Sequence, residues 1–228
     1  MAEFVGTRAA GLAAMQTFVA SMGRRYEQGR NYDNGPGQHT NVSMLSPYIR
    51  RRLITEHEVI TAALDAHGPD DASKFVEEVI WRGYYKGWLE RRPQVWDSYV
   101  VGRDADFAAV KRDGRLRRDI ELAEAGNTGF NYFDSWAQEL TQTGYLHNHA
   151  RMWFASIWIF TLGLPWRIGA DFFFRHLLDG DPASNTCSWR WVAGLHTRGK
   201  TYQAKASNIA TFTEDRFTPR DEDLAADL

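Results

Sequence analysis

Apolar residues recur at the spacing of a helix along most of the chain. In the segment 9–25, Leu12, Met15, Val19 and Met22 fall on one helix face. The same spacing predicts further helices over residues 46–66, 72–90, 133–143, 147–162 and 167–178. Runs of alternating apolar and polar positions, which would indicate β-strands, are not found. The pattern therefore predicts an all-α fold, built as a single helical bundle.

Turn-forming residues separate these helices. Residues 29–40 are rich in Gly, Asn and Asp and predict a loop, and Ser46-Pro47 is typical of a helix N-cap followed by Pro at the first helical position. The Gly-Pro-Asp sequence at 68–70 predicts the end of that helix. Residues 103–126 are highly charged and predict one or two exposed helices, whereas residues 179–188 are expected to be rich in turns.

One domain over residues 1–212 is the simplest organisation, because the chain contains neither internal repeats nor low-complexity tracts. From Thr213 onward acidic residues accumulate and the helical spacing is lost. Residues 213–228 are therefore predicted to form a flexible acidic tail.

Composition narrows the class of protein. Apolar residues make up 43% of the chain and charged residues 25%, as in a soluble globular protein. The aromatic share of 14% can fill a core or line a flat cofactor, and composition alone leaves both open. The net charge of −2 gives no overall basic signature of a nucleic-acid binder, although a local basic face stays open.

Cysteine content and apolar stretches indicate where the protein acts. Cys187 is the single cysteine, which excludes an intramolecular disulfide and favours a reducing compartment. Residues 1–7 lack the basic and apolar regions of a secretory signal. The most apolar stretch, 152–164, is too short to cross a bilayer. We therefore expect a soluble, cytoplasmic protein with no membrane partner.

Several common chemistries find no support. The chain has no Gly-rich dinucleotide motif after a strand, no Walker loop and no Gly-x-Ser-x-Gly motif. His147 and His149 stand two residues apart, so on a helix they project to different sides and cannot share one ion. We expect no metal site.

Three segments place polar groups within apolar surroundings, and the first is Glu78, Trp81 and Arg82. These residues share one helix face because they stand at i, i+3 and i+4. A carboxylate, an indole and a guanidinium on one face can bind a polar ligand. The alternative is an ion pair within the helix, on a face that water solvates.

The second segment is Asn148, Arg151 and Met152, which share a face just before a strongly apolar helix. Polar groups that enter a buried helix need partners, and a polar ligand can supply them. The alternative is a polar first turn that faces water.

The third segment carries two carboxylates, Asp179 and Asp181, followed by the amide of Asn185 and the indoles of Trp189 and Trp191. An Asp-Gly-Asp sequence alone is commonly a solvated turn or a weak calcium site. The further spaced oxygen ligands of an EF-type loop are missing here.

In this order, the three segments resemble the FAD-binding domain of DNA photolyases and cryptochromes. The Glu-x-x-Trp-Arg helix of that family is matched by Glu78–Arg82, and its Gly-Trp-Met-His-Asn-x-x-Arg-Met motif by Gly144–Met152. The resemblance covers about residues 6–202. The matching segments are residues 26–31, 43–48, 78–82, 128–134, 144–152, 178–185 and 189–191.

The resemblance implies an α-helical bundle that holds FAD. By similarity, Tyr26, Ser43 and Ser46 would hold the pyrophosphate and the nearby ribityl oxygens. Phosphate at Ser46 is physically apt, because a helix N-terminus favours anions. Arg82 would support the adenine end and its phosphates.

The flavin end of FAD would lie against the later motifs. By similarity, Arg151 would lie near the flavin and pair with Asp179, and Asp181 would accept a hydrogen bond from the N3 side of the ring. Asn185 would face flavin N5, as in photolyases. Trp189 and Trp166 match the inner two members of the family's electron-transfer tryptophans.

The resemblance also implies a substrate pocket made of Glu78, Trp81, Asn148, Met152 and Trp191. In such proteins, reduced flavin absorbs blue light and passes one electron to a flipped-out pyrimidine dimer in DNA, which then splits. We therefore expect a photolyase-like enzyme acting on such DNA, with single strands favoured.

Departures from the family leave alternatives open. A segment matching the α/β antenna domain is not found, so a separate antenna or partner protein is conceivable. His149 stands where the family has Arg, and no Trp occurs in 103–126, where the outer electron-transfer Trp is expected. The alternatives are a cryptochrome-like blue-light photoreceptor without repair activity, and a helical scaffold that binds another protein.

Overall fold

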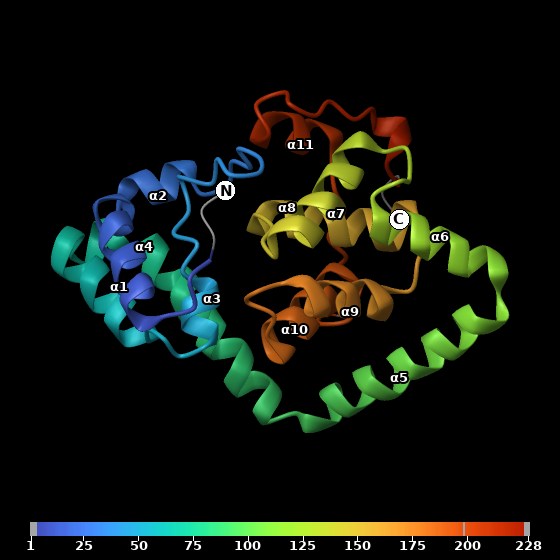
Figure 1. Ribbon diagram of the computed structural model, residues 1–228, viewed down its shortest axis with the longest axis horizontal. Coiled ribbons are helices and arrows are strands. Elements are labelled where there is room, and N and C mark those ends of the chain that lie inside the picture. The colour runs from blue at the N-terminus through green and yellow to red at the C-terminus, as the bar shows by residue number, and fades with distance from the viewer. Residues whose placement is uncertain (1–3, 198, 226–228) are drawn as a thin grey trace. The chain divides into compact units, whose positions relative to one another are not determined.

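The computed structural model describes residues 4–197 and 199–225, and their regular elements are helices without strands (Figure 1). The predicted all-α fold is therefore confirmed. The chain divides into two compact units, Met1–Gly87 and Trp88–Leu228, where the sequence indicates a single bundle.

Unit 1 contains α1 (Arg8–Phe18), the 3-10 turn η1 (Val19–Ser21), α2 (Arg24–Gly29), α3 (Ser46–Arg50) and most of α4 (Glu56–Glu90). Its core is made of apolar side chains that these helices direct toward one another. The buried members are Phe18, Met22, Leu45, Tyr48, Ile49, Ile54, Val59, Ala63, Ala72 and Phe75.

The predicted continuous helix over 46–66 is wrong. α3 ends at Arg50, Arg52 takes a positive φ of 59°, and α4 begins at Glu56. The new start is fixed by a capping box, in which the Thr55 hydroxyl accepts from Glu58 N at 3.2 Å and the Glu58 carboxylate accepts from Thr55 N at 2.9 Å. Ser46 is the first helical residue of α3, one position after its N-cap.

The break predicted at 68–70 is present as a kink inside α4. Gly68 has φ 73° and ψ 170°, which is not helical, and Pro69 follows it directly. Glycine adopts this backbone without a Cβ clash, so the helix axis changes direction between its two halves.

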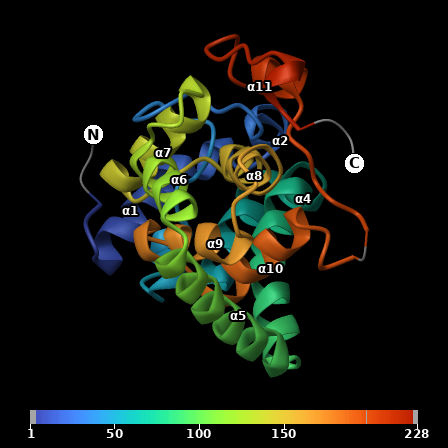
Figure 2. The same cartoon turned by 90° about the vertical axis from the view of Figure 1, so that its right-hand side faces the viewer.

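Unit 2 contains α5 (Pro93–Arg112), α6 (Gly114–Ala125), α7 (Asn131–Thr143), α8 (Asn148–Ser156), the π-helical turn η2 (Ile157–Thr161), α9 (Trp166–His176), α10 (Pro182–Val192), α11 (Ala206–Phe212) and the 3-10 turn η3 (Asp221–Asp223). α9 packs against both α10 and α5 (Figure 1, Figure 2). The core is strongly aromatic, and its largest fully buried side chains include Trp136, Trp153, Trp158 and Trp189.

Two stretches of unit 2 differ from the sequence prediction. Residues 179–188 were expected to be rich in turns, but α10 already begins at Pro182. After Thr213, where a flexible tail is predicted, Phe217 and Leu224 are buried in the core of unit 2. Widely spaced anchors of this kind leave no helical period in the sequence.

Within residues 4–197 and 199–225, none of the helices has the combined length and apolar character needed to cross a bilayer. The 103–126 segment forms the end of α5 and all of α6, as predicted.

Candidate functional site

The Arg151–Asp179 ion pair expected from the sequence is present in unit 2. Arg151 lies on the first turn of α8, and its Nη1 is 3.2 Å from Asp179 Oδ2. Its Nε donates to the Leu146 carbonyl at 2.8 Å, and the guanidinium lies 5.6 Å from the Tyr145 ring centroid. The Asp179 side chain is only 7% exposed. A buried carboxylate is thus fixed beside a cation that several contacts orient.

Asp181 forms the N-cap of α10. Its Oδ1 accepts hydrogen bonds from Ala183 N and Ser184 N, both at 3.0 Å. Pro182 occupies the first turn, where a missing N–H costs nothing. A negative charge at the N-terminus of a helix also interacts favourably with the helix dipole. The carboxylate therefore fixes the start of α10 and places the polar residues that follow.

Asn185 is buried one turn further along α10. Its Nδ2 donates to the Ala170 carbonyl of α9 at 2.7 Å, which fixes the orientation of the amide. The neighbouring Ser184 hydroxyl is buried and has no hydrogen-bond partner among residues 4–197 and 199–225. A buried hydroxyl of this kind favours a polar ligand nearby.

Trp189 and Trp166 do not meet through their rings in the part of the chain that the structure describes. Trp189 is buried and lies edge-to-face against Trp158, with ring centroids 6.4 Å apart. Trp166 is half-buried and lies beside Tyr99 of α5, at 5.8 Å. Trp189 is a buried member of the core of unit 2, and Trp166 packs against that core.

In unit 1, the three residues expected at the FAD phosphates lie in α2 and at the start of α3. Tyr26 on α2 packs edge-to-face against Phe75 at 5.0 Å, and burial raises the pKa of its phenol to about 12. The hydroxyl is therefore a neutral donor. Ser46 is the first residue of α3, and Ser43, just before the helix, accepts a hydrogen bond on its Oγ from Leu45 N at 3.4 Å.

Glu78 and Arg82 have different ion-pair partners within unit 1. Glu78 forms an ion pair with Arg30 and lies 3.7 Å from Lys74 Nζ of its own helix. Arg82 Nε lies 3.9 Å from Glu56 Oε1 at the start of α4. Sequence spacing identifies only partners within one helix, so the distant partner of Glu78 was missed.

Trp81 and Trp191 are exposed, as residues that stack on a ligand must be. Trp81 is 43% exposed and meets Tyr84 edge-to-face at 5.2 Å. Trp191 is 38% exposed and stacks on Tyr202, with centroids 5.3 Å apart and planes 28° apart. Sequence reasoning missed Tyr202, since it lies outside every family motif.

Asn148 and Met152 lie one turn apart at the start of α8, as their spacing predicts. His147 is the N-cap, and its Nδ1 accepts from His149 N at 3.2 Å. The His149 ring stacks on Trp153 at 4.2 Å. The two histidines therefore have structural contacts of different kinds.

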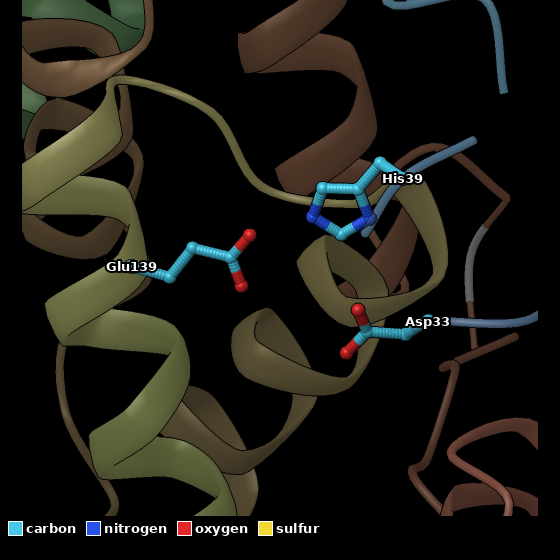
Figure 3. A group of neighbouring side chains, drawn as sticks. All are labelled: Asp33, His39 and Glu139. Carbon is cyan, nitrogen blue, oxygen red and sulfur yellow. The ribbon is translucent and has the colours of Figure 1, made fainter. Parts of the chain in front are cut away.

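Three further buried groups of metal-ligand type are drawn in Figure 3, namely Asp33, His39 and Glu139. Asp33 and His39 come from the loop between α2 and α3 in unit 1, and Glu139 comes from α7 in unit 2. Asp33 Oδ1 accepts from Gly35 N at 3.2 Å, an interaction typical of a turn. We assign no ion to these residues, because they belong to two separate units.

Comparison with known proteins identifies one family. The family model described as the FAD binding domain of DNA photolyase matches residues 75–219. Tyr26, Ser43 and Ser46 precede this match. A deoxyribodipyrimidine photo-lyase of Agrobacterium fabrum is 32% identical over 186 residues, which are 80% of this chain and 37% of that protein. One from Streptomyces griseus is 34% identical over 176 residues, 75% of this chain and 35% of that protein.

Solved structures agree on the fold. A bacterial class III photolyase from Agrobacterium tumefaciens has a TM-score of 0.75 at 28% identity, and the match covers 92% of this chain and 43% of that one. A Synechocystis cryptochrome has a TM-score of 0.70 at 22% identity and shares the fold. The chain thus spans well under half the length of these relatives.

Proposed function

The chain belongs to the family of FAD-binding domains of DNA photolyases, whose cofactor is FAD, and from this premise we propose that it uses light absorbed by FAD to split pyrimidine dimers in DNA. The observation that supports this best is the buried Arg151–Asp179 pair next to the capped start of α10. Together they put a cation, two carboxylates and an amide on adjoining segments of unit 2.

The residues present suit a flavin. Asp181 offers a buried carboxylate to a ring N–H, and Asn185 offers an amide whose orientation Ala170 fixes. The buried, unpartnered Ser184 hydroxyl fits a polar ligand at the same turn. Arg151 and Asp179 would hold the flavin end of FAD. When bound, FAD supplies a single electron after it absorbs blue light.

The phosphate and adenine ends of FAD would be held by residues of unit 1. Tyr26 is a neutral hydroxyl donor, Ser43 and Ser46 offer hydroxyls around the start of α3, and Arg82 supplies positive charge. Phosphate oxygens accept strong hydrogen bonds from groups of these kinds.

The DNA substrate would meet exposed aromatic rings and a fixed carboxylate. Trp81 and Trp191 offer stacking surfaces to a flipped-out base, as in other single-strand binding sites. Arg30 orients the Glu78 carboxylate, which can then accept a hydrogen bond from the damaged base. In unit 2, Asn148 and Met152 at the start of α8 would also contact the damaged base.

Single-stranded DNA is the favoured substrate, because the net charge of −2 leaves little phosphate attraction to offset the cost of flipping. An unpaired lesion lowers that cost by about a few kcal/mol. The same proposal includes a separate antenna or partner protein. It also includes action in the cytoplasm, because the buried thiol of Cys187 stays reduced there.

The test has two stages. The purified protein should be yellow and release FAD, rather than FMN, on denaturation. Chemically reduced protein should then remove cyclobutane dimers from a single-stranded oligonucleotide under blue light at low salt, and not in the dark. A colourless protein that does not take up added FAD would exclude the flavin site itself.

A blue-light photoreceptor without repair activity is the second candidate. It is favoured by His149, which stands where the family has Arg and stacks on Trp153. A stacked imidazole cannot replace the reach or the permanent charge of a guanidinium. Bound, reduced FAD without dimer loss above the dark control would favour this candidate.

A further inference from the structure

The turn between α7 and α8 is joined to the segment between α9 and α10 by a backbone hydrogen bond. Leu178 N donates to the Gly144 carbonyl at 2.9 Å. Gly144 is the C-cap of α7, and Leu178 directly precedes Asp179 of the candidate flavin site. The bond therefore fixes the backbone from which the Asp179 side chain extends.

Arg151, the ion-pair partner of Asp179, is held by the same turn. Its Nε donates to the Leu146 carbonyl at 2.8 Å, and its guanidinium lies 5.6 Å from the Tyr145 ring centroid. One turn thus holds the cation through a carbonyl and a ring, and holds the carboxylate through the backbone. A closed ring of contacts links the turn, the cation and the carboxylate.

The close approach at this joint depends on the absence of a side chain at Gly144. A Cβ there would lie 2.7 Å from Leu178 Cγ, 3.2 Å from Leu178 Cδ1 and 3.3 Å from the His176 carbonyl oxygen. Moving the Cγ atom requires either a new rotamer of a half-buried side chain or a shift of the backbone. The His176 oxygen is itself part of the backbone. An added methyl group should therefore displace the chain that carries Asp179.

The backbone conformation at Gly144 also favours glycine. Its φ of 68° and ψ of 14° are left-handed, and its N–H donates to the Leu140 carbonyl at 2.9 Å, which ends α7. A side chain in this conformation costs stability wherever it occurs. Gly163 has a similar φ of 64°, but among the described residues no atom beyond its chain neighbours lies within 4 Å of its Cβ position. Gly163 therefore isolates the cost of the backbone conformation alone.

We propose that Gly144 is a positioning residue for FAD. Because it lacks a side chain, it permits the backbone contact with Leu178, and this contact holds Asp179 where Arg151 can reach it. The proposal rests on the proposed function in one respect, since Arg151 and Asp179 are the residues that would hold the flavin end of FAD. Gly144 itself acts through these residues.

The geometry of the ion pair explains why a small displacement matters. Arg151 Nη1 donates to Asp179 Oδ2 at 3.2 Å, which is already at the upper end of hydrogen-bond distances. A shift of a few tenths of an ångström would break this bond. Side chains bind a rigid ligand well only when their relative positions are closely fixed. FAD affinity should therefore fall although neither charge has been removed.

The experiment titrates FAD into the full chain after the flavin has been removed, and follows thermal unfolding of the same FAD-free protein. Gly144→Ala should weaken FAD binding by about 10- to 100-fold, the loss expected for one hydrogen bond between charged groups. Gly163→Ala is the matched control. It should lose stability through the same left-handed backbone and keep the native FAD affinity.

Truncation of the opposing side chain provides a result that a general loss of stability would not produce. Leu178→Ala removes Cγ and Cδ1 and keeps the N–H that donates to Gly144. Alone it should keep FAD affinity, and combined with Gly144→Ala it should restore most of the lost affinity. At saturating FAD, the vibronic structure of the flavin absorption band should be reduced in Gly144→Ala and restored in the double variant.

The outcomes separate this proposal from the proposed function. Loss of FAD in Asp179→Ala together with native affinity in Gly144→Ala would overturn the positioning role and leave the flavin site intact. Weak binding in Gly144→Ala that Leu178→Ala does not restore would also overturn it. A native protein that binds no FAD would overturn both proposals. If Gly144→Ala does not fold, Gly144→Asn and Gly163→Asn decide, because Asn adopts a left-handed backbone at lower cost and still carries a Cβ.

Discussion

The Arg30 guanidinium forms an ion pair with the Glu78 carboxylate, across 48 residues of sequence within unit 1. The side chains are 22% and 30% exposed, so the pair is partly shielded from water. The carboxylate that would contact the lesion is thus oriented by Arg30, the C-cap of α2, as well as by Lys74 of its own helix. Arg30 is therefore a positioning residue in the proposed pocket.

Glu78→Gln should lower the free energy of unfolding by about 1 kcal/mol, since a partly exposed ion pair contributes little more. Urea unfolding of Glu78→Gln, Arg30→Gln and the double variant should reveal coupling, because the two residues are in contact. The same substitution should keep FAD and lose most of the dimer-splitting yield. Glu77→Gln, on the neighbouring exposed position, is the control. Additive effects in the cycle would contradict the pairing.

The elements that the sequence predicts well are those with long apolar periods. Residues 133–143 and 147–162 pack their apolar positions into one core, so the period is visible and the helices were confirmed. The start of α10 was missed, because Asp-Gly-Asp-Pro is a turn signal until Asp181 is recognised as a cap. The local sequence is compatible with either a turn or a helix start at this point, and the packing of α10 against α9 selects the helix.

Asp179→Ala should abolish FAD retention and keep most of the helix content. Arg151 would lose the partner of its partly buried guanidinium, and breaking a buried pair costs about 3–5 kcal/mol. Flavin absorption after gel filtration and far-UV circular dichroism measure the two effects. Asp119→Ala, which breaks an exposed pair with Arg115, should change neither. Full flavin occupancy in Asp179→Ala would show that Asp179 does not hold the cofactor.

Asp181 has two separable roles, and two variants distinguish them. Asp181→Ala removes the cap of α10 and should cost about 1 kcal/mol of stability. Asp181→Asn keeps an oxygen for the cap but replaces an acceptor with a donor, so it should keep the stability and weaken FAD binding. Thermal unfolding without FAD and titration with FAD measure the effects. If Asp181→Asn and the native protein bind FAD with equal affinity, Asp181 serves only as the cap of α10.

The candidate site was predictable as residue types, and its contacts were predictable only in part. Arg151 and Asp179 were paired through family resemblance, and the pair is present. The Arg30–Glu78 pair and the Trp191–Tyr202 stack were missed, because each joins residues without a common helical period or a shared motif. Such contacts form when the tertiary fold brings separate segments together, and local residue patterns do not encode this.

Glu58 should make unit 1 sensitive to acid. The Arg8 guanidinium, at 2.5 Å, and the Thr55 hydrogen bonds lower the pKa of the Glu58 carboxyl from 4.5 to about 2. Because the folded pKa is depressed, the stabilisation is present above pH 4.5 and is lost as pH falls through about 2. Glu58→Gln should flatten the loss of stability in this window. Glu27→Gln, an exposed carboxyl on α2, is the control, and an equal acid dependence in all three proteins would contradict the assignment.

Trp191 should bind a base, and Tyr202 should keep it in position to do so. The two rings stack at 5.3 Å, and 38% of Trp191 stays exposed for a ligand. Trp191→Ala should weaken binding of a dimer-containing single strand by about 1–3 kcal/mol, the contribution of one stacked base. Tyr202→Ala should weaken it by about 0.5–1.5 kcal/mol through loss of the supporting ring, and Tyr202→Phe should not.

Fluorescence anisotropy with a labelled oligonucleotide at low salt measures both effects. The contribution of phosphate contacts to affinity decreases as the salt concentration rises, whereas the contribution of stacking does not. The difference in binding free energy between the native protein and Trp191→Ala should therefore stay the same as salt increases. A difference that disappears with salt would mean that the substitution had acted on phosphate contacts. Native affinity in Trp191→Ala would show that Trp191 does not contact the bound base.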